Sequence, residues 1–171
     1  MPGILFDQDR TELSDSAMTT ATVIPGTLVR IFNKGVLLTG DSGIGKSDLA
    51  LALMDRGHTL VADDAVELSV TADRLTGYAP AALHGLLEVR GLGPLRQTRC
   101  ADQCEIAVVV NLVQPTREQW ASWPRLHGKW DAVTLGGICL RRLHLPVASG
   151  RPLPLLLEAV ARTHDGEMRH G

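Results

Sequence analysis

The sequence predicts an α/β domain with a mixed sheet arranged around a phosphate-binding loop. The loop is Gly40-Asp41-Ser42-Gly43-Ile44-Gly45-Lys46-Ser47, which fits the P-loop pattern G-x-x-x-x-G-K-[ST]. An apolar run precedes it and a helical pattern follows it, which is the context that the motif requires. With 171 residues, the chain is long enough for one domain with a sizeable core.

Composition and charge argue against several classes of function. The formal net charge is −2 and the pI is about 6.3, so there is no basic excess for nucleic acid and no uniform charge for a membrane surface. No apolar run reaches membrane-spanning length, and no secretory signal is visible. We therefore expect a cytoplasmic protein without a nucleic-acid or membrane partner.

The cysteines and histidines form no recognisable metal or disulfide pattern. Cys100 and Cys104 have a spacing that would place them on one helix face, but two thiols do not complete a zinc site. With Cys139, they are expected to be free thiols in a reducing compartment. Packed or surface positions are expected for the histidines, among them His84, His127 and His144.

The N-terminal part of the chain leads to the loop through a hairpin. Residues 1–21 are polar and acidic without sustained periodicity, which predicts a flexible leader before a domain at residues 22–171. Residues 27–32 are expected to form a strand. A turn at Asn33-Lys34-Gly35 and a strand at residues 36–39 then bring the chain to the loop.

A helix is expected after the loop. Apolar residues recur there at helical spacing before a stop at Gly57, namely Leu49, Ala50, Leu53 and Met54. In such a loop, backbone N–H groups point at phosphate oxygens and the helix N-terminus adds a favourable dipole. Lys46 is expected to reach the β- and γ-phosphates of ATP, and the Ser47 hydroxyl to ligate Mg²⁺. The alternative is a glycine-rich turn that matches by chance.

A second set of polar groups follows the next strand. The apolar run 59–62 ends in Asp63-Asp64, and ligands of open α/β sheets bind at the carboxyl ends of strands. An Asp there would hold Mg²⁺ or accept a proton from a nucleophile. With one helix between loop and carboxylates, we expect a compact βαβ unit. The alternative is a surface turn, since Asp is a common turn residue.

Two more strands, at residues 65–70 and 75–78, are expected to flank a turn at residues 71–74. The segment 83–93 then combines three glycines, Glu88 and Arg90 with apolar residues. A charged pair in an apolar run costs free energy unless it is paired or ligating. Glu88 is therefore either a second Mg²⁺ ligand or the partner of Arg90 on a surface strand.

The remaining elements complete the domain. The Val-rich run 106–113 predicts a central strand covered on both faces. One or two helical turns are expected within residues 116–123, a strand at 138–145 and a C-terminal helix at 155–162. Three tryptophans lie near basic residues, an arrangement that serves nucleic-acid binding or, more often, packing or an oligomer contact: Trp120, Trp123 and Trp130.

Four segments together resemble the catalytic domain of bacterial HPr kinase/phosphorylase. They are residues 40–47, 56–58, 62–64 and 86–93, and the resemblance extends from about Gly26 to Arg162. It implies a fold related to phosphoenolpyruvate carboxykinase and phosphorylation of a serine on the phosphocarrier protein HPr. It also implies reversal by phosphorolysis and a homo-oligomer, commonly a hexamer. A short form without the family's amino-terminal domain is expected.

The resemblance also implies roles for individual residues. Lys46 would contact phosphate, and Ser47 and Glu88 would ligate Mg²⁺. Asp64 would accept the proton of the substrate serine, with Asp63 as its neighbour and alternative. Two arginines would join them, because residues 123–126 and 146–151 look like family segments that carry catalytic arginines: Arg125 and Arg151.

The chain departs from the family pattern at three places. Pro25-Gly26 stands where the family has His-Gly, and the loop that carries Arg151 has Ala148 and Pro152 in place of an Arg and an Asn. The leading hypothesis is therefore an ATP- and Mg²⁺-dependent serine kinase of an HPr-like carrier with weak phosphorolysis. The alternatives are a nucleotide-sensing interaction module that transfers no phosphoryl group and a kinase for a small molecule.

Overall fold

The computed structural model describes residues 21–163, so the predicted leader lies, except for Ala21, outside the described residues. The elements follow the chain in the order β1 (Thr22–Pro25), β2 (Thr27–Ile31), β3 (Lys34–Thr39), α1 (Lys46–Asp55), β4 (Thr59–Ala62), β5 (Ala65–Thr71), β6 (Arg74–Tyr78), η1 (Ala81–Leu83), β7 (Leu86–Val89), β8 (Gly93–Arg96), β9 (Gln103–Val113), α2 (Arg117–Ala121), β10 (Lys129–Leu135), β11 (Ile138–Pro146) and α3 (Leu153–Thr163).

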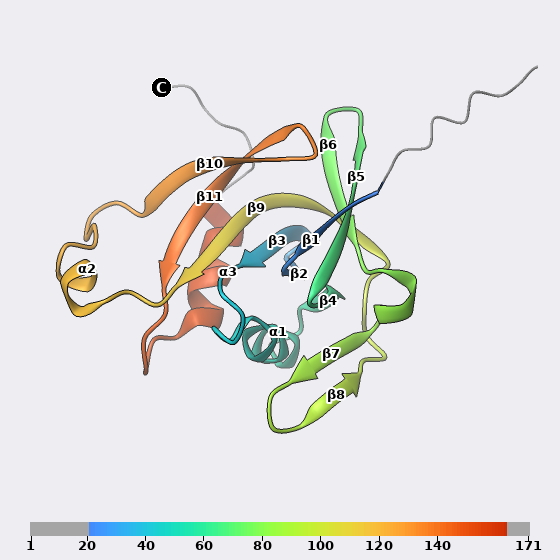
Figure 1. Cartoon of the computed structure of the whole chain (residues 1–171), viewed down its shortest axis with the longest axis horizontal. Coiled ribbons are helices and arrows are strands. Elements are labelled where there is room, and N and C mark those ends of the chain that lie inside the picture. Colours follow the sequence, from blue (N-terminus) through green and yellow to red (C-terminus); the bar gives the residue numbers. More distant parts are fainter. Residues whose placement is uncertain (1–20, 164–171) are drawn as a thin grey trace, which may run out of the picture.

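The predicted mixed sheet is confirmed. Nine strands form one sheet in which β9 runs through the middle, with β3 and β11 parallel to it and β6 antiparallel. The hairpin of β7 and β8 forms a separate small sheet beside α1 (Figure 1). The prediction of a central, doubly covered strand is also correct, because Val108 and Val110 face one core cluster and Val109 faces the other.

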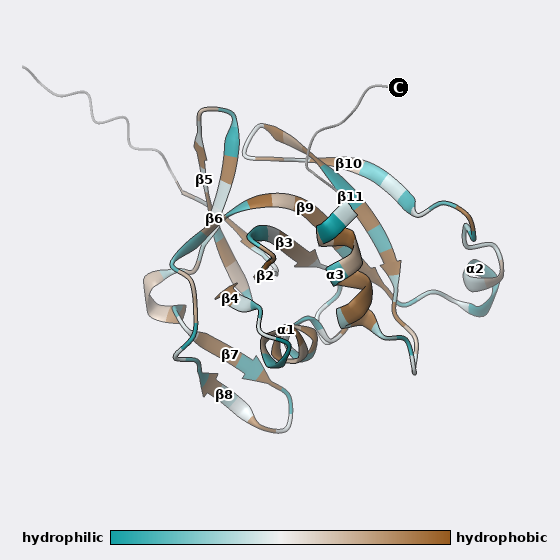
Figure 2. Ribbon diagram, turned by 180° about the vertical axis from the view of Figure 1, so that it is seen from behind, coloured by the Kyte–Doolittle hydropathy of each residue, from teal (hydrophilic) through white to brown (hydrophobic). Residues whose placement is uncertain are grey.

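Each face of the sheet has its own hydrophobic core. On one face, buried side chains of α1 and α3, including Leu53 and Leu157, pack against strand residues such as Leu38. Figure 2 shows the apolar character of α3 on this side of the molecule. On the other face, Leu37 packs with residues of β5 and β6, among them Leu68. The packing of α1 and α3 on the sheet thus fixes the position of the phosphate loop.

Strand β3, helix α1 and strand β4 form the predicted strand–helix–strand unit, but β2 lies between its two strands. The hairpin β2–β3 turns at Phe32 and Asn33, which both adopt positive φ, one residue earlier than expected. Strand β2 then pairs antiparallel with both β3 and β4, so it lies between the two parallel strands. As a result, the end of β4 lies across β2 from the start of the loop.

The sequence does not predict β1, β8 and β10, and it predicts a strand at the position of β7 only in the alternative that pairs Glu88 with Arg90. Strand β8 contains a glycine and a proline, which normally argue against a strand. Strand β10 is mostly exposed and therefore lacks a long apolar run. The helices α2 and α3 lie where they were expected, although α3 begins two residues earlier and ends one residue later than predicted.

A buried ion-pair network joins the end of α1 to α3. The Arg56 guanidinium donates two hydrogen bonds of 2.7 Å to Glu158, and His58 Nε2 lies 2.9 Å from the same carboxylate. These contacts, with Arg56 contributing most, lower the pKa of Glu158 from its ordinary 4.5 to about 2. A carboxyl group whose pKa is lower in the folded chain stabilises the fold above its unfolded pKa, and this stabilisation disappears as the pH falls from about 4.5 towards about 2.

Replacing Glu158 by glutamine should therefore destabilise the fold in a pH-dependent way. We expect the melting temperature to fall by several degrees at pH 7, because the buried side chain at position 158 loses its charge-assisted hydrogen bonds to Arg56. The gap in melting temperature to the unmodified chain should narrow as the pH approaches 3, because below about 4.5 the Glu158 carboxyl of the unfolded chain binds a proton that folding must release. Thermal unfolding monitored by circular dichroism between pH 7 and pH 3 measures this, with exposed Glu118→Gln as the matched control. A gap that stays constant over this pH range would contradict the account.

Candidate active site

The phosphate loop is a tight connection between β3 and α1 that depends on glycine. Gly43 and Gly45 have φ values of 81° and 107°, in the left-handed region that side chains rarely adopt. Gly45 is the residue before the first turn of α1, and no side chain in the described part of the protein caps that helix end. The first N–H groups of α1 therefore remain oriented for an anion.

The Lys46 side chain hydrogen-bonds to the backbone of its own loop. Its ammonium group donates to the carbonyl oxygens of Gly40 at 2.9 Å and Asp41 at 3.0 Å. The side chain thus bends back over the loop and keeps a positive charge beside its backbone N–H groups. This is the combination of a cation and oriented backbone dipoles that binds phosphate groups.

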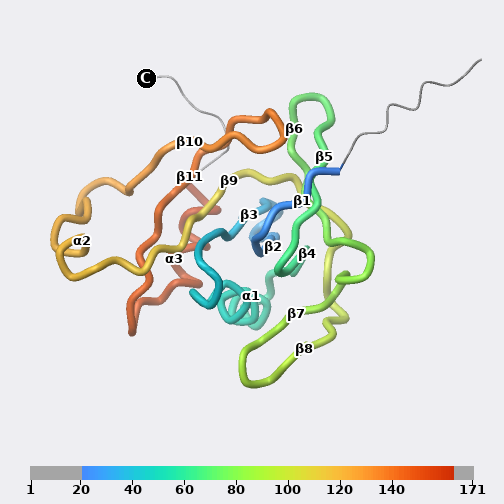
Figure 3. Tube along the Cα trace, in the orientation of Figure 1, coloured from blue at the N-terminus to red at the C-terminus, as the bar shows by residue number. Residues whose placement is uncertain are grey.

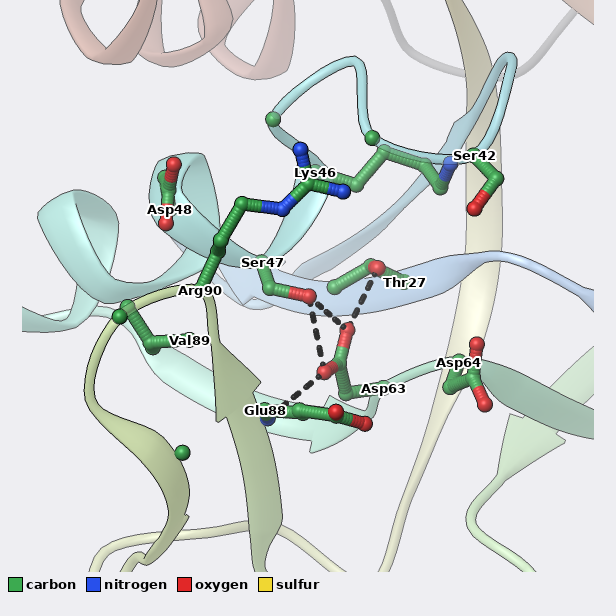
Figure 4. A pocket seen from close by; sticks show the side chains of 14 residues that line it. Thr27, Ser42, Lys46, Ser47, Asp48, Asp63, Asp64, Glu88, Val89 and Arg90 are labelled. Atoms are coloured by element: carbon green, nitrogen blue, oxygen red, sulfur yellow. Dashed lines mark hydrogen bonds between the residues drawn. The ribbon is translucent and has the colours of Figure 1, made fainter.

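Asp63 is the most strongly held carboxylate of the site. It is buried with 4% exposure. The Thr27 hydroxyl donates to Oδ1 at 2.8 Å, the Ser47 hydroxyl lies 2.9 Å from both oxygens, and the backbone N–H of Glu88 donates to Oδ2 at 3.2 Å. Figure 4 shows these contacts converging on Asp63 from three different segments. The surface-turn alternative is therefore wrong for Asp63, which joins the loop, β2 and β7.

Asp64 differs from Asp63 in its exposure and in its side-chain contacts. It is exposed and lies in the same cavity, yet its carboxylate has no hydrogen-bond or ion-pair partner among the described residues. Its backbone has φ of 69°, and its carbonyl accepts a hydrogen bond of 3.2 Å from the N–H of Gly26. Aspartate adopts this conformation more readily than most residues, and the contact with Gly26 helps to hold it here.

The hairpin of β7 and β8 forms the opposite wall of the site. Glu88 is exposed on β7 and lines the same cavity as Ser47 and Asp64, a space of about 570 Å³. Arg90 follows the strand, and its guanidinium lies against the loop. A side-chain carbon added to Gly43 would lie 3.2 Å from a nitrogen of this guanidinium. The structure therefore brings together Lys46, Ser47, both aspartates and Glu88, as the sequence predicts.

The donor set around Ser47 suits Mg²⁺ bound with a nucleotide. Mg²⁺ prefers oxygen ligands and is usually held by one or two carboxylates together with substrate phosphates. The Ser47 hydroxyl and the carboxylates of Asp63 and Glu88 are hard oxygen donors that line one cavity beside the phosphate loop. The residues present thus fit a Mg²⁺–nucleotide.

Two of the predicted catalytic residues lie elsewhere. Arg125 and Arg151 line a second cavity of about 630 Å³, walled by the three tryptophans, and neither lines the cavity of the phosphate loop. Figure 3 shows α2 at the left end of the molecule and the β7–β8 hairpin at the bottom, next to α1. Within one chain, these arginines are not part of the phosphate-loop site.

Some polar groups at the second cavity have partners within the chain. Arg151 donates to the Pro146 carbonyl at 2.7 Å, and its guanidinium carbon lies 5.5 Å from the centre of the Trp120 ring. At the nearby edge, Asp131 forms hydrogen bonds with Arg142 and with His144. These contacts, with Arg142 contributing most, hold the pKa of the Asp131 carboxyl well below its usual range. His144 in turn lies 3.2 Å from Asn111, a residue of the central strand.

The sequence did not single out two residues of the site. Thr27 opens an apolar strand, and its burial at 1% exposure together with its bond to Asp63 became evident only in the fold. The sequence pattern marks Arg90 as a charge in an apolar run but does not predict its position at the loop. In both cases the sequence offered one signal for a site residue, a polar residue at a terminus of an apolar strand. Its closeness to the loop became evident only in the fold.

Comparisons with known proteins point to one family. A family model described as the HPr Serine kinase C-terminal domain matches residues 16–170. The chain is 38% identical over 160 residues to the HPr kinase/phosphorylase of Chromobacterium violaceum, covering 90% of this chain and 50% of that protein. It is 42% identical over 148 residues to the Bordetella pertussis protein of the same name, covering 82% and 47%. The chain thus spans about half the length of these curated relatives.

A solved structure is similar over nearly its whole length. The HPr(Ser) kinase/phosphatase from Coxiella burnetii superimposes with a TM-score of 0.74 and 31% identity, covering 82% of this chain and 88% of that one. Among residues 21–163, no helix is long and apolar enough to cross a membrane.

Proposed function

The chain belongs to the family of the HPr serine kinase C-terminal domain, and from this membership we propose that it is an ATP- and Mg²⁺-dependent protein serine kinase acting on an HPr-like phosphocarrier. The observation that carries the proposal is that two adjacent aspartates have different surroundings. Asp63 is fully engaged with the loop and the strands, whereas Asp64 is exposed beside them in the same cavity.

Binding of the nucleotide falls to the loop. Its backbone N–H groups and the Lys46 ammonium would hold the phosphates, as in other P-loop proteins. Ser47, oriented by Asp63, and Glu88 would hold Mg²⁺, which when bound neutralises charge on the phosphate oxygens. Arg90 adds a further cation next to the loop. Positioning and charge neutralisation of this kind account for most of the catalysis of phosphoryl transfer.

Proton transfer falls to Asp64. A proton acceptor must reach the hydroxyl of an incoming serine, and an exposed carboxylate at the opening of the cavity meets that requirement. Asp63 is poorly suited, because its two oxygens already accept hydrogen bonds from Thr27, Ser47 and the Glu88 backbone. The held backbone of Asp64 keeps its carboxylate at the cavity without side-chain contacts.

Replacing Glu88 by glutamine should weaken the response to Mg²⁺. We expect about tenfold more Mg²⁺ to be needed for half-maximal nucleotide binding, equivalent to about 1.4 kcal/mol. Nucleotide binding without Mg²⁺ should be unchanged, since Glu88 contacts Asp63 only through its backbone N–H. Calorimetric titration at several Mg²⁺ concentrations measures both quantities, with Glu118→Gln as the control. An unchanged Mg²⁺ requirement would remove Glu88 from the metal site.

Phosphorolysis should be weak. Pro25 is paired with Ala65 in the β1–β5 ladder, so the position where the resembling family has histidine lies beside Asp64. A proline supplies neither a proton nor a hydrogen bond, and loss of one oxyanion donor typically costs about 10²-fold in rate. We therefore expect pyrophosphate release from a phosphorylated carrier at millimolar phosphate to be at least about 10²-fold slower than the forward reaction. Comparable rates in both directions would contradict this prediction.

The proposal includes a homo-oligomer, and by resemblance a hexamer. Arg125 and Arg151 remain proposed catalytic residues only in such an assembly, since in one chain they line a different cavity. Sedimentation velocity tests the assembly directly. Mixing Arg125→Ala chains with Lys46→Ala chains tests the sharing of sites, because activity should reappear in mixed oligomers. If neither variant recovers activity on mixing, these arginines have no role in a neighbouring site.

The experiment for the function itself combines the purified chain with Mg²⁺–ATP and candidate carrier proteins. Intact mass spectrometry should show one phosphoryl group added to an HPr-like carrier. The Asp64→Asn chain should leave the carrier unmodified over the same period. Nucleotide binding without transfer to any carrier would support the nucleotide-sensing module instead.

A further inference from the structure

Cys100 lies against an imidazole outside the nucleotide site. It follows β8 in the loop that leads to β9, and its side chain is half-buried. Its sulfur lies 3.9 Å from both ring nitrogens of His84, the residue after η1. The two residues come from different segments, so the contact is a product of the fold rather than of sequence proximity.

An acidic residue completes the arrangement. Asp102 Oδ1 lies 3.2 Å from His84 Nε2. When Nε2 carries the proton and donates it to Asp102, Nδ1 is left without a proton, 3.9 Å from the Cys100 sulfur and able to accept the thiol proton. A thiol, an imidazole and a carboxylate in this order form the arrangement that activates cysteine nucleophiles, because the thiolate is the reactive form and the carboxylate orients its base.

The other thiols of the chain lack this arrangement. Cys104 is buried on β9, and burial raises the pKa of its thiol, which disfavours the thiolate. Cys139 is exposed next to the β10–β11 turn, and its thiol has no polar partner among the described residues. Cys139 is therefore an internal reference for an accessible thiol without an adjacent base.

The loop of Cys100 is joined to both strands that support the nucleotide site. Cys100 forms a bridge with Leu60 of β4, and the N–H of Ala101 donates to the Leu60 carbonyl at 2.8 Å. Strand β4 ends directly before Asp63. On the other side, Gln97 donates to the Gly85 carbonyl at 2.7 Å, just before β7, which carries Glu88.

The Cys100 sulfur lies close to the chain just before β7. A side-chain carbon on Gly85 would lie 3.5 Å from the sulfur, at ordinary contact distance. A bulky group on that sulfur would thus be attached between the bridge to β4 and the start of β7. These are the two strands that lead to Asp63 and carry Glu88, whose N–H donates to Asp63.

We propose that Cys100 is a site of reversible mixed-disulfide formation with a low-molecular-weight disulfide, activated by His84, and that its modification weakens nucleotide binding. His84 accepts the thiol proton, and the thiolate attacks one sulfur of the disulfide. A new S–S bond forms to Cys100 while the old S–S bond breaks, and the departing thiolate takes the proton from the imidazolium. The net reaction converts one protein thiol and one disulfide into a mixed disulfide and one free thiol. The consequence for nucleotide binding rests on the proposed function, whereas the modification itself does not.

The first test measures reaction rates with glutathione disulfide on the full native chain, by intact mass and peptide mapping. Cys100 should react at least about tenfold faster than Cys139, since a positioned base typically contributes 10²-fold or more. His84→Gln should slow Cys100 and leave Cys139 unchanged. Asp102→Asn should also slow Cys100, and because its side chain is 95% exposed the change poses little threat to folding. Equal rates at the two cysteines, or no effect of either substitution, would overturn the proposal.

The second test measures nucleotide binding before and after modification, with a fluorescent ATP analogue and the Cys139→Ser chain. Modified protein should bind about tenfold more weakly, within the usual range for coupling between two sites, and should recover on reduction. A Cys100→Ser chain treated in the same way should be unaffected. Unchanged affinity of the fully modified chain would overturn the proposal. Failure of the unmodified chain to bind nucleotide would instead count against the proposed function.

Discussion

A chain with Asp64→Asn should bind Mg²⁺–ATP with unchanged affinity and yet phosphorylate its carrier at least about 10²-fold more slowly, the usual contribution of a positioned general base. The reason is that the Asp64 carboxylate is exposed and has no side-chain partner within residues 21–163, so its loss disturbs no contact seen there. Asparagine tolerates the positive φ of 69° at this position, which keeps the backbone in place. The affected step is thus acceptance of the serine proton.

The measurement is single-turnover phosphorylation of the carrier followed by intact mass, together with calorimetry of nucleotide binding. Asp73→Asn is the matched control, because Asp73 is also exposed, also has positive φ and lies in the β5–β6 turn away from the cavity. Asp63→Asn should behave differently and lose stability as well as activity, since an NH2 donor would replace the oxygen that accepts from Ser47 and from the Glu88 N–H. Full activity of Asp64→Asn, with a stable but inactive Asp63→Asn chain, would reverse the two roles.

The chain with Lys46→Ala should lose affinity for triphosphate by about 10²-fold, because hydrogen bonds to charged groups contribute about 1.5–3 kcal/mol each. The substitution removes a cation from the loop and also the bonds of 2.9 Å and 3.0 Å that hold Gly40 and Asp41. Both effects weaken binding. Nucleoside without phosphates should bind equally to both chains, because Lys46 acts on the phosphates.

Calorimetry with ATP and with adenosine separates these effects. Lys129→Ala is the control, because this exposed lysine lies over the Trp123 ring at the second cavity and not at the loop. Melting temperatures of all three chains show whether the loop contacts matter for folding. Equal ATP affinity in Lys46→Ala and the unmodified chain would contradict the assignment of the loop as the phosphate site.

Local patterns were sufficient to predict the phosphate loop and the elements on either side of it. The motif, the strand before it and the helix after it depend on residues that are close in sequence, so spacing and residue type define them. The same holds for the run 59–62 and the carboxylates that follow. The central strand was recognisable because Val108, Val109 and Val110 are buried on both faces.

Contacts between distant segments were not predictable in this way. The roles of Asp63 and Asp64 separate only because Thr27 and the β7 backbone reach Asp63 from other strands. The position of β2 between β3 and β4 depends on strand pairing, which residue type does not specify. The pairing of Cys100 with His84 was missed for the same reason, and the helix face suggested for Cys100 and Cys104 was wrong because Cys104 lies on β9.

The most direct test of the central claim follows the γ-phosphoryl group itself. The chain is incubated with Mg²⁺ and ATP labelled at the γ-phosphate, together with an HPr-like carrier or the same carrier with its acceptor serine replaced by alanine. The account predicts label on the serine of the first carrier, none on the second, and none with the Asp64→Asn chain. Tight nucleotide binding with no label on any serine would contradict it.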